Sequence, residues 1–216
     1  MAGLSVGLVA GAISGGLVAW LKVPSFLVTL GMLGLLVGVA RWITASAPIP
    51  IADQTYIAIF GGGQLGSVPT IFIWVTLVVG IGAIVMNKTK FGRHVRATGG
   101  NLVAAGYTGV KTARVKFIVL MLSGGGAALA GMLYAGRLQS GRFQWGTGDE
   151  LSVIAAVILG GTSLFGGRGQ VIGSLFGAVF IGLINNGLIL MGLDVSQQQV
   201  VRGAIIILAV ALSRKK

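Results

Sequence analysis

Long runs without any charged residue are the feature of this 216-residue sequence that most restricts its fold. Asp, Glu, Lys and Arg are all absent from seven stretches, at 1–21, 23–40, 54–87, 117–136, 151–167, 169–193 and 203–213. A helix needs about 20 apolar residues to cross the roughly 30 Å of hydrocarbon in a bilayer, and several of these runs reach that length. The sequence therefore predicts a protein with several membrane-spanning helices.

The composition agrees, because hydrophobic residues make up 55% of the chain and charged residues only 9%, against about 25% charged in soluble domains. We predict seven helical segments, at 2–21, 24–44, 69–87, 117–136, 150–165, 171–191 and 197–213. The fifth is the shortest and ends in Gly-Gly-Thr-Ser, so it is either a full span or a broken, re-entrant half-helix. The predicted fold class is all-α, a polytopic membrane protein with about seven transmembrane or partly re-entrant helices.

The basic residues between the hydrophobic runs predict an orientation. Alternating the seven segments with residues 88–116 in the cytoplasm places twelve of the 16 basic residues inside and all four acids outside or at outer helix ends. Cytoplasmic loops of membrane proteins are enriched in Lys and Arg, so we expect the N-terminus outside and the C-terminus in the cytoplasm. The net charge of +12 then marks topology, and no nucleic-acid partner is expected.

The titratable residues argue against an enzyme. His94 is the single histidine and cysteine is absent, so neither a zinc site nor a Ser-His-Asp triad has its partners. No predicted span has an acid near its middle, which argues against a proton relay or a membrane hydrolase. The glycine pattern "GGGQLG" at 61–66 follows no predicted strand, so it is not a nucleotide site. We expect no catalytic residue, no metal and no cofactor bound by this chain.

Glycines and polar residues inside the predicted spans have structural or functional interpretations. Three pairs with small-xxx-small spacing, Gly11/Gly15, Gly34/Gly38 and Gly173/Gly177, predict close helix packing. Four polar residues either bond a neighbouring helix or line a path for a polar solute, and both interpretations stay open: Thr162, Ser163, Asn185 and Asn186. The outer segment 45–69 has an apolar centre, "YIAIF", which predicts a short interfacial element that rests on the membrane or docks an extracytoplasmic partner.

Four segments together resemble a known family. They are "VPSFLVTLGM" (23–32), "FGRHVRATGGNLVAAGYTGV" (91–110), "ELSVIAAVILGGTSLFGGRG" (150–169) and "GLINNGLILMG" (182–192). In this order they resemble the permease subunits of bacterial ABC importers for ribose, xylose and related sugars, and the similarity covers nearly the whole chain. Members of that family usually carry additional spans before the equivalent of residue 1, so we expect this chain to lack N-terminal spans.

The resemblance implies a function. It implies a single permease domain over residues 1–216, in the bacterial inner membrane, with a cytoplasmic coupling loop at 88–116. The implied partners are a cytoplasmic ATPase subunit that binds the ATP, an extracytoplasmic sugar-binding protein, a second permease copy or homologue, and membrane lipid. The residues that match the family's coupling segment are Gly99, Gly100, Asn101, Leu102, Ala104, Ala105, Tyr107 and Gly109.

The residue types in this segment fit a short helix that contacts a partner. Asn101 can cap a helix starting at Leu102, and Gly109 can end it in a left-handed conformation. The small side chains of Ala104 and Ala105 allow close approach. The alternatives are a stand-alone secondary carrier or channel, and an ABC permease for a non-sugar solute such as a nucleoside or autoinducer. The sequence names neither the solute nor the pairing of permeases.

Overall fold

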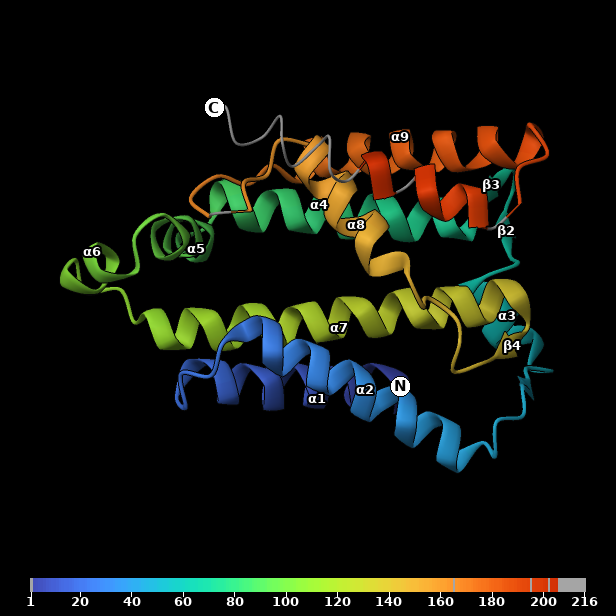
Figure 1. Cartoon of the computed structure of the whole chain (residues 1–216), viewed down its shortest axis with the longest axis horizontal. Coiled ribbons are helices and arrows are strands. Elements are labelled where there is room, and N and C mark those ends of the chain that lie inside the picture. Colours follow the sequence, from blue (N-terminus) through green and yellow to red (C-terminus); the bar gives the residue numbers. More distant parts are fainter. Residues whose placement is uncertain (1, 165, 195, 202, 206–216) are drawn as a thin grey trace. The chain divides into compact units, whose positions relative to one another are not determined.

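The computed structural model describes residues 2–164, 166–194, 196–201 and 203–205, and these residues are mainly helical (Figure 1). The helices are α1 (Ala2–Ala19), α2 (Ser25–Ile43), α3 (Gln54–Phe60), α4 (Thr70–Lys88), α5 (Lys90–Gly100), α6 (Leu102–Tyr107), α7 (Thr112–Leu138), α8 (Asp149–Leu159) and α9 (Val171–Leu190). The strands have two residues each: β1 (Ile49–Pro50), β2 (Gln64–Leu65), β3 (Val68–Pro69) and β4 (Ser140–Gly141). The predicted all-α fold class is confirmed.

In the part of the chain that the structure describes, five helices are long and apolar enough to cross a membrane: α1, α2, α4, α7 and α9. They coincide with five of the seven predicted segments. The start of α7 lies at Thr112, before the predicted 117, because a helix continues past the hydrocarbon and its basic residues Arg114 and Lys116 do not end it. The chain is therefore a multi-pass membrane protein.

Of the other two predicted segments, the fifth is shorter than a full span and the seventh is described only in part. In the fifth, α8 has 11 residues and a length of about 16 Å at 1.5 Å per residue, roughly half the hydrocarbon thickness. It ends at Leu159 instead of 165, because Gly160 and Gly161 interrupt the helix, and it fits the half-helix alternative. The seventh, 197–213, lies partly outside the described residues; residues 196–201 and 203–205 are helical.

The chain divides into two compact units, each made of two pieces of sequence. The first consists of Met1–Val78 and Gly109–Trp145, and the second of Val79–Thr108 and Gly146–Lys216. The division passes through the middle of α4. The interpretation of residues 1–216 as one permease domain, and the predicted orientation in the membrane, stay predictions.

In the first unit α1 packs antiparallel against α7 through glycines, and the two helices lie side by side in Figure 1. A side-chain carbon on Gly11 would lie 2.6 Å from the carbonyl oxygen of Leu120 and 2.9 Å from the α-carbon of Met121. One on Gly15 would lie 2.9 Å from the carbonyl oxygen of Phe117. The predicted packing role of Gly11/Gly15 is confirmed, because only glycine lets the two backbones come this close.

The matching pair on α2 behaves differently. At Gly34 and Gly38 an added side-chain carbon would meet no atom of the described chain within 4 Å. The same spacing of small residues therefore gives close packing in α1 but not in α2, and the packing predicted for Gly34/Gly38 is absent within the described chain. The difference depends on which face of each helix another helix covers.

We expect Gly11→Leu to destabilise the protein and Gly34→Leu to leave its stability nearly unchanged. The first substitution forces a side chain into the backbone of α7, and overpacking of this kind costs about 1–3 kcal/mol. The second points into open space. Thermal unfolding of the two purified variants in the same detergent measures the difference. Equal melting temperatures would contradict the α1–α7 packing.

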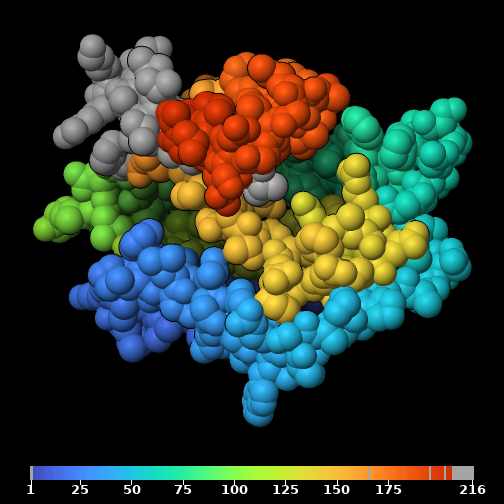
Figure 2. Space-filling view, turned by 45° about the vertical axis from the view of Figure 1, so that its right-hand side comes forward, coloured from blue at the N-terminus to red at the C-terminus, as the bar shows by residue number. Residues whose placement is uncertain are grey.

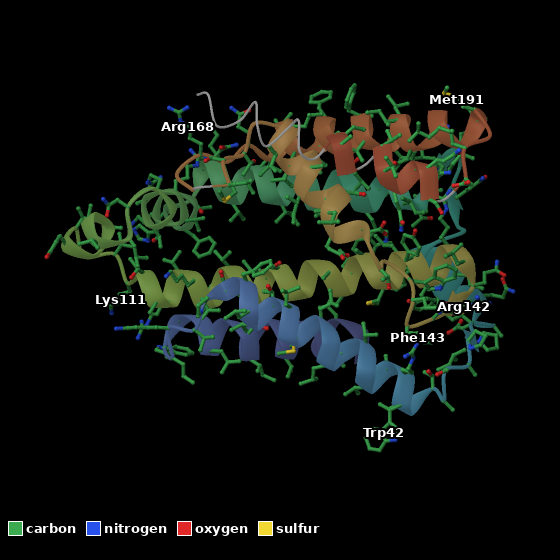
Figure 3. The ribbon with its side chains drawn as sticks, in the orientation of Figure 1. Trp42, Lys111, Arg142, Phe143, Arg168 and Met191 are labelled. Carbon is green, nitrogen blue, oxygen red and sulfur yellow. The ribbon has the colours of Figure 1, made fainter. Side chains whose placement is uncertain are left out.

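The end of the first unit beyond α2 and α7 is built from short elements and aromatic side chains. β1 pairs with β4, and Figure 2 shows the yellow segment after α7 beside the light-blue segment before α3. The guanidinium carbon of Arg41 lies 4.8 Å from the ring centre of Phe143. Trp42 is 84% exposed and projects away from α2 (Figure 3).

The predicted element around "YIAIF" is the helix α3. Asp53 caps this helix, because its carboxylate accepts from the backbone N–H of Thr55 at 2.9 Å. The hydroxyl of Tyr56 donates to the carbonyl oxygen of Met132 at 3.0 Å, and burial raises the pKa of this hydroxyl. The glycine pattern at 61–66 contributes Gln64 and Leu65 to the β2–β3 hairpin.

In the second unit α8 and α9 form a close pair (Figure 1). Side-chain carbons on Gly173 and Gly177 would collide with the carbonyl oxygens of Gly160 and Ala156, so these helices touch through their backbones. Ala155, Ala156 and Ile181 form the buried core of this pair. The predicted packing role of Gly173/Gly177 is confirmed.

Candidate functional site

The polar segment between α4 and α7 contains two helices, and the sequence analysis predicted one of them. The unpredicted helix is α5, which begins after Thr89. The hydroxyl oxygen of Thr89 caps it by accepting from the backbone N–H of Gly92 at 3.2 Å. Its signals were present, since Thr89 is a good N-cap residue and the half-buried Phe91 and Val95 lie four positions apart on one helix face. The density of basic residues concealed this pattern. His94 is exposed.

Arg96 ties α5 to the end of α4. Its guanidinium donates to the carbonyl oxygen of Met86 and to the side-chain oxygen of Asn87, both at 2.6 Å. The carbonyl groups of the last helical turn have no partner within their helix, and a cation there also complements the helix dipole. The basic residue therefore does more than mark topology, because it holds the polar segment to a membrane-spanning helix.

The helix α6 has the ends that the sequence predicts. The side-chain oxygen of Asn101 accepts from the backbone N–H groups of Val103 and Ala104, each at 3.0 Å. The helix begins at Leu102 and ends at Tyr107, and Gly109 follows with a φ of +84°, a conformation that glycine adopts without strain. The cap at Asn101 and the left-handed Gly109 are confirmed.

The surface of α6 is unusually apolar for a segment outside the membrane spans. Val103 is 64% and Tyr107 is 89% exposed, and Leu102 and Ala104 are exposed as well. Ala105 differs, because it is only 4% exposed. Its small side chain therefore serves packing within this chain, and of the two alanines only Ala104 offers a close approach to another protein.

A contact that the sequence analysis missed lies at the start of this segment. A side-chain carbon on Gly99 would lie 3.0 Å from the backbone nitrogen of Gly167, and one on Gly100 would lie 3.6 Å from the α-carbon of Gly167. One on Gly166 would collide with the carbonyl group of Gly99. Figure 1 shows the loop between α8 and α9 beside α5, and Arg168 on this loop is labelled in Figure 3. The adjacent glycines of "GGRG" were the available signal.

Thr162 and Ser163 lie in the same loop. The hydroxyl oxygen of Thr162 accepts from the backbone N–H of Gln170 at 3.2 Å and lies 3.4 Å from the hydroxyl of Ser174. The backbone N–H of Ser163 donates to the carbonyl oxygen of Arg168 at 3.0 Å. Both residues thus stabilise the turn that connects α8 to α9.

Asn185 and Asn186 lie near the other end of α9. Ser174 beside Thr162 is eleven positions before Asn185 in α9, a separation of about 16 Å along the helix. Asn186 is exposed and Asn185 is half-buried. A groove of about 560 Å³ between α8 and α9 is lined by glycines and apolar side chains, among them Phe176 and Phe180, and by none of the four polar residues. The structure does not bring the two polar groups together, and the solute-path hypothesis stays a prediction.

The comparisons with known proteins agree with this arrangement. A family model described as the permease component of a branched-chain amino acid transport system matches residues 1–210. The chain is 43% identical, over 88% of its length and 57% of the relative's, to the probable ABC transporter permease protein YphD of Escherichia coli (strain K12). No solved structure matches the chain.

Two further relatives differ in the solute that their names give. The chain is 39% identical to the ribose import permease protein RbsC of Escherichia coli (strain K12), over 100% of this chain and 68% of the relative. It is 38% identical to the autoinducer 2 import system permease protein LsrC of Salmonella paratyphi B, over 96% of this chain and 60% of the relative. The chain thus spans 57% to 68% of the length of these relatives.

Proposed function

This chain belongs to the family of permease components of branched-chain amino acid transport systems, and we propose that it is the membrane-spanning subunit of an ATP-driven sugar importer. In this function it contributes to the translocation path in the bacterial inner membrane. A separate cytoplasmic subunit binds and hydrolyses ATP, so the chain itself needs no catalytic residue or cofactor. An extracytoplasmic sugar-binding protein delivers the solute, and a second permease copy or homologue completes the path.

The observation that carries the proposal is the exposed apolar surface of α6. Val103 and Tyr107 project from a short, capped helix outside the five candidate spans. Contiguous apolar side chains exposed to water indicate a surface that another protein covers. The basic residues of α5 hold this helix at the anionic cytoplasmic surface, where an ATPase subunit docks. The name of one relative, a probable ABC transporter permease protein, supports the same partner.

The proposed solute is a pentose sugar, and ribose is the first compound to test. The ribose import permease is a relative that aligns with the whole chain. A polar solute needs hydrogen-bonding groups along its path, and Asn185 and Asn186 provide amides within a predicted span. Autoinducer 2 is the second candidate, since the import permease for that compound is similar over nearly the same length.

Copurification and uptake test the proposal together. The tagged protein, expressed in its own bacterium, should copurify with an ABC ATPase subunit. Deletion of its gene should abolish uptake of radiolabelled ribose at low external concentration. Loss of autoinducer 2 uptake instead of ribose uptake would change the solute and retain the ABC mechanism. Uptake without any associated ATPase would support the alternative of a stand-alone carrier or channel and overturn the proposal.

A further inference from the structure

We propose that the contact of Gly99 and Gly100 with Gly166 and Gly167, which we name the glycine joint, transmits movement of α6 to the α8–α9 pair. The inference rests on the proposed function, in which an ATPase subunit moves α6. It adds a specific element to that function, because it assigns the coupling between ATPase and permease to four glycines. Two of them, Gly166 and Gly167, lie in the segment 150–169, which the sequence singled out only for its resemblance to the family.

In the joint the backbones of the four glycines face one another directly. The facing groups are the carbonyl of Gly99, the backbone nitrogen of Gly167 and the α-carbons of the glycines. Side chains can absorb a displacement by changing rotamer, whereas contacting backbones pass it on. Gly166 and Gly167 have φ values of +90° and +79°, which only glycine adopts without strain, so the loop conformation itself depends on these residues.

The connection between α6 and the glycine joint is short. One residue, Asn101, separates α5 from α6, and it is fixed in both directions. Its backbone N–H donates to the carbonyl oxygen of Ala97 at 3.1 Å, and its side chain caps α6 through Val103 and Ala104. A displacement of α6 therefore reaches Gly99 and Gly100 without an intervening flexible linker.

On its other side, the glycine joint is connected directly to α8 and α9. The loop that carries Gly166 and Gly167 is stabilised by Thr162 and Ser163, through the hydrogen bonds to Gln170 and Arg168 described above. It joins the end of α8 to the start of α9, and these helices touch through the backbones of Gly160 and Gly173 and of Ala156 and Gly177. Backbone contacts and hydrogen bonds of 3.0 and 3.2 Å thus connect Gly99 to the start of α9, and α9 carries Asn185 and Asn186.

A substitution that places a side chain in the glycine joint tests the inference. We expect Gly99→Val to assemble normally with the ATPase subunit but to hydrolyse more ATP for each ribose imported, by about tenfold or more, a range typical of coupling between sites. The measurement uses proteoliposomes with the ATPase and binding protein. Gly182→Val is the matched control, because an added side-chain carbon there meets no described atom within 4 Å. A merely structural contact would lower the amount of protein without changing the ratio of ATP to ribose.

A disulfide cross-link across the glycine joint provides a second test, because it holds the two segments together instead of forcing them apart. The chain has no cysteine, so Gly100→Cys combined with Gly167→Cys introduces a single possible disulfide across the joint, where an added side-chain carbon on Gly100 would lie 3.6 Å from the α-carbon of Gly167. If the joint moves as one body, the oxidised protein should import ribose as fast as its reduced form. Loss of uptake on oxidation that returns on reduction would show that the two segments must separate, and it would overturn the inference.

The outcomes separate this inference from the proposed function. If the wild-type protein neither binds an ATPase subunit nor imports ribose, the proposed function fails. If the wild type does both and Gly99→Val keeps the ATP-to-ribose ratio of Gly182→Val, the inference alone fails. Should the double-cysteine variant not fold, the ratio of ATP hydrolysed to ribose imported in Gly99→Val still tests the inference.

Discussion

Replacing Ala104 by Arg is expected to abolish copurification of the ATPase subunit and, with it, sugar uptake. Ala104 is an exposed position of α6, beside the exposed Val103. In a closely fitted interface a long cationic side chain would be desolvated without a partner, which costs several kcal/mol. Each 1.4 kcal/mol is a factor of ten in affinity, so the loss is about a hundredfold or more. Quantitative pull-down of the ATPase subunit measures it.

The matched control is Ala97→Arg on α5. Ala97 is also exposed and also helical, and it lies in the same basic segment. Arg is nearly as good a helix former as Ala, and an added cytoplasmic Arg agrees with the predicted topology, so both variants should reach the membrane in normal amounts. Equal losses in the two variants would make the segment an electrostatic tether without a specific docking face, and full activity in Ala104→Arg would remove α6 from the interface.

The second large effect is expected at Asn186. Asn186→Leu should abolish sugar uptake while ATPase binding stays intact, because leucine suits the apolar environment of α9 but offers a solute no hydrogen bond. The residue is exposed on the described chain, so the substitution fills no buried space. Uptake of radiolabelled ribose and pull-down of the ATPase subunit, measured on the same membranes, give the two readouts.

Asn186→Ser provides the control for this prediction. Serine keeps a hydrogen-bonding group, so it should retain much more uptake than leucine if Asn186 contacts the solute. Asn185→Leu tests the neighbouring residue in the same assay. Normal uptake in both leucine variants would assign the two amides to contacts between helices and leave the solute path to other residues.

Much of this architecture could be predicted from the sequence because it depends on local composition. The spacing of charged residues located α1, α2, α4, α7 and α9, since a bilayer imposes one length on any helix that crosses it. The cap at Asn101 and the left-handed Gly109 were likewise predictable, because capping is decided by the residues within one helical turn. Helix ends in polar surroundings were less predictable, as the early start of α7 shows.

The tertiary structure decided which of several equivalent patterns is used. Gly11 and Gly34 belong to pairs with the same spacing, yet only Gly11 meets another backbone, because α7 covers one helix face and the described chain leaves the other open. Ala104 and Ala105 are adjacent and chemically identical, yet one is exposed and the other buried, since successive helical residues point about 100° apart.

The sequence by itself therefore determined the membrane class, the positions of five spans and the helix α6, all of which follow from the solvent and from neighbouring residues. The glycine joint was decided by the tertiary structure alone. Gly99 and Gly167 are far apart in the chain, and glycine has no side chain whose size, charge or periodicity could indicate a distant partner. A contact made by backbones becomes visible only when the fold has brought them together.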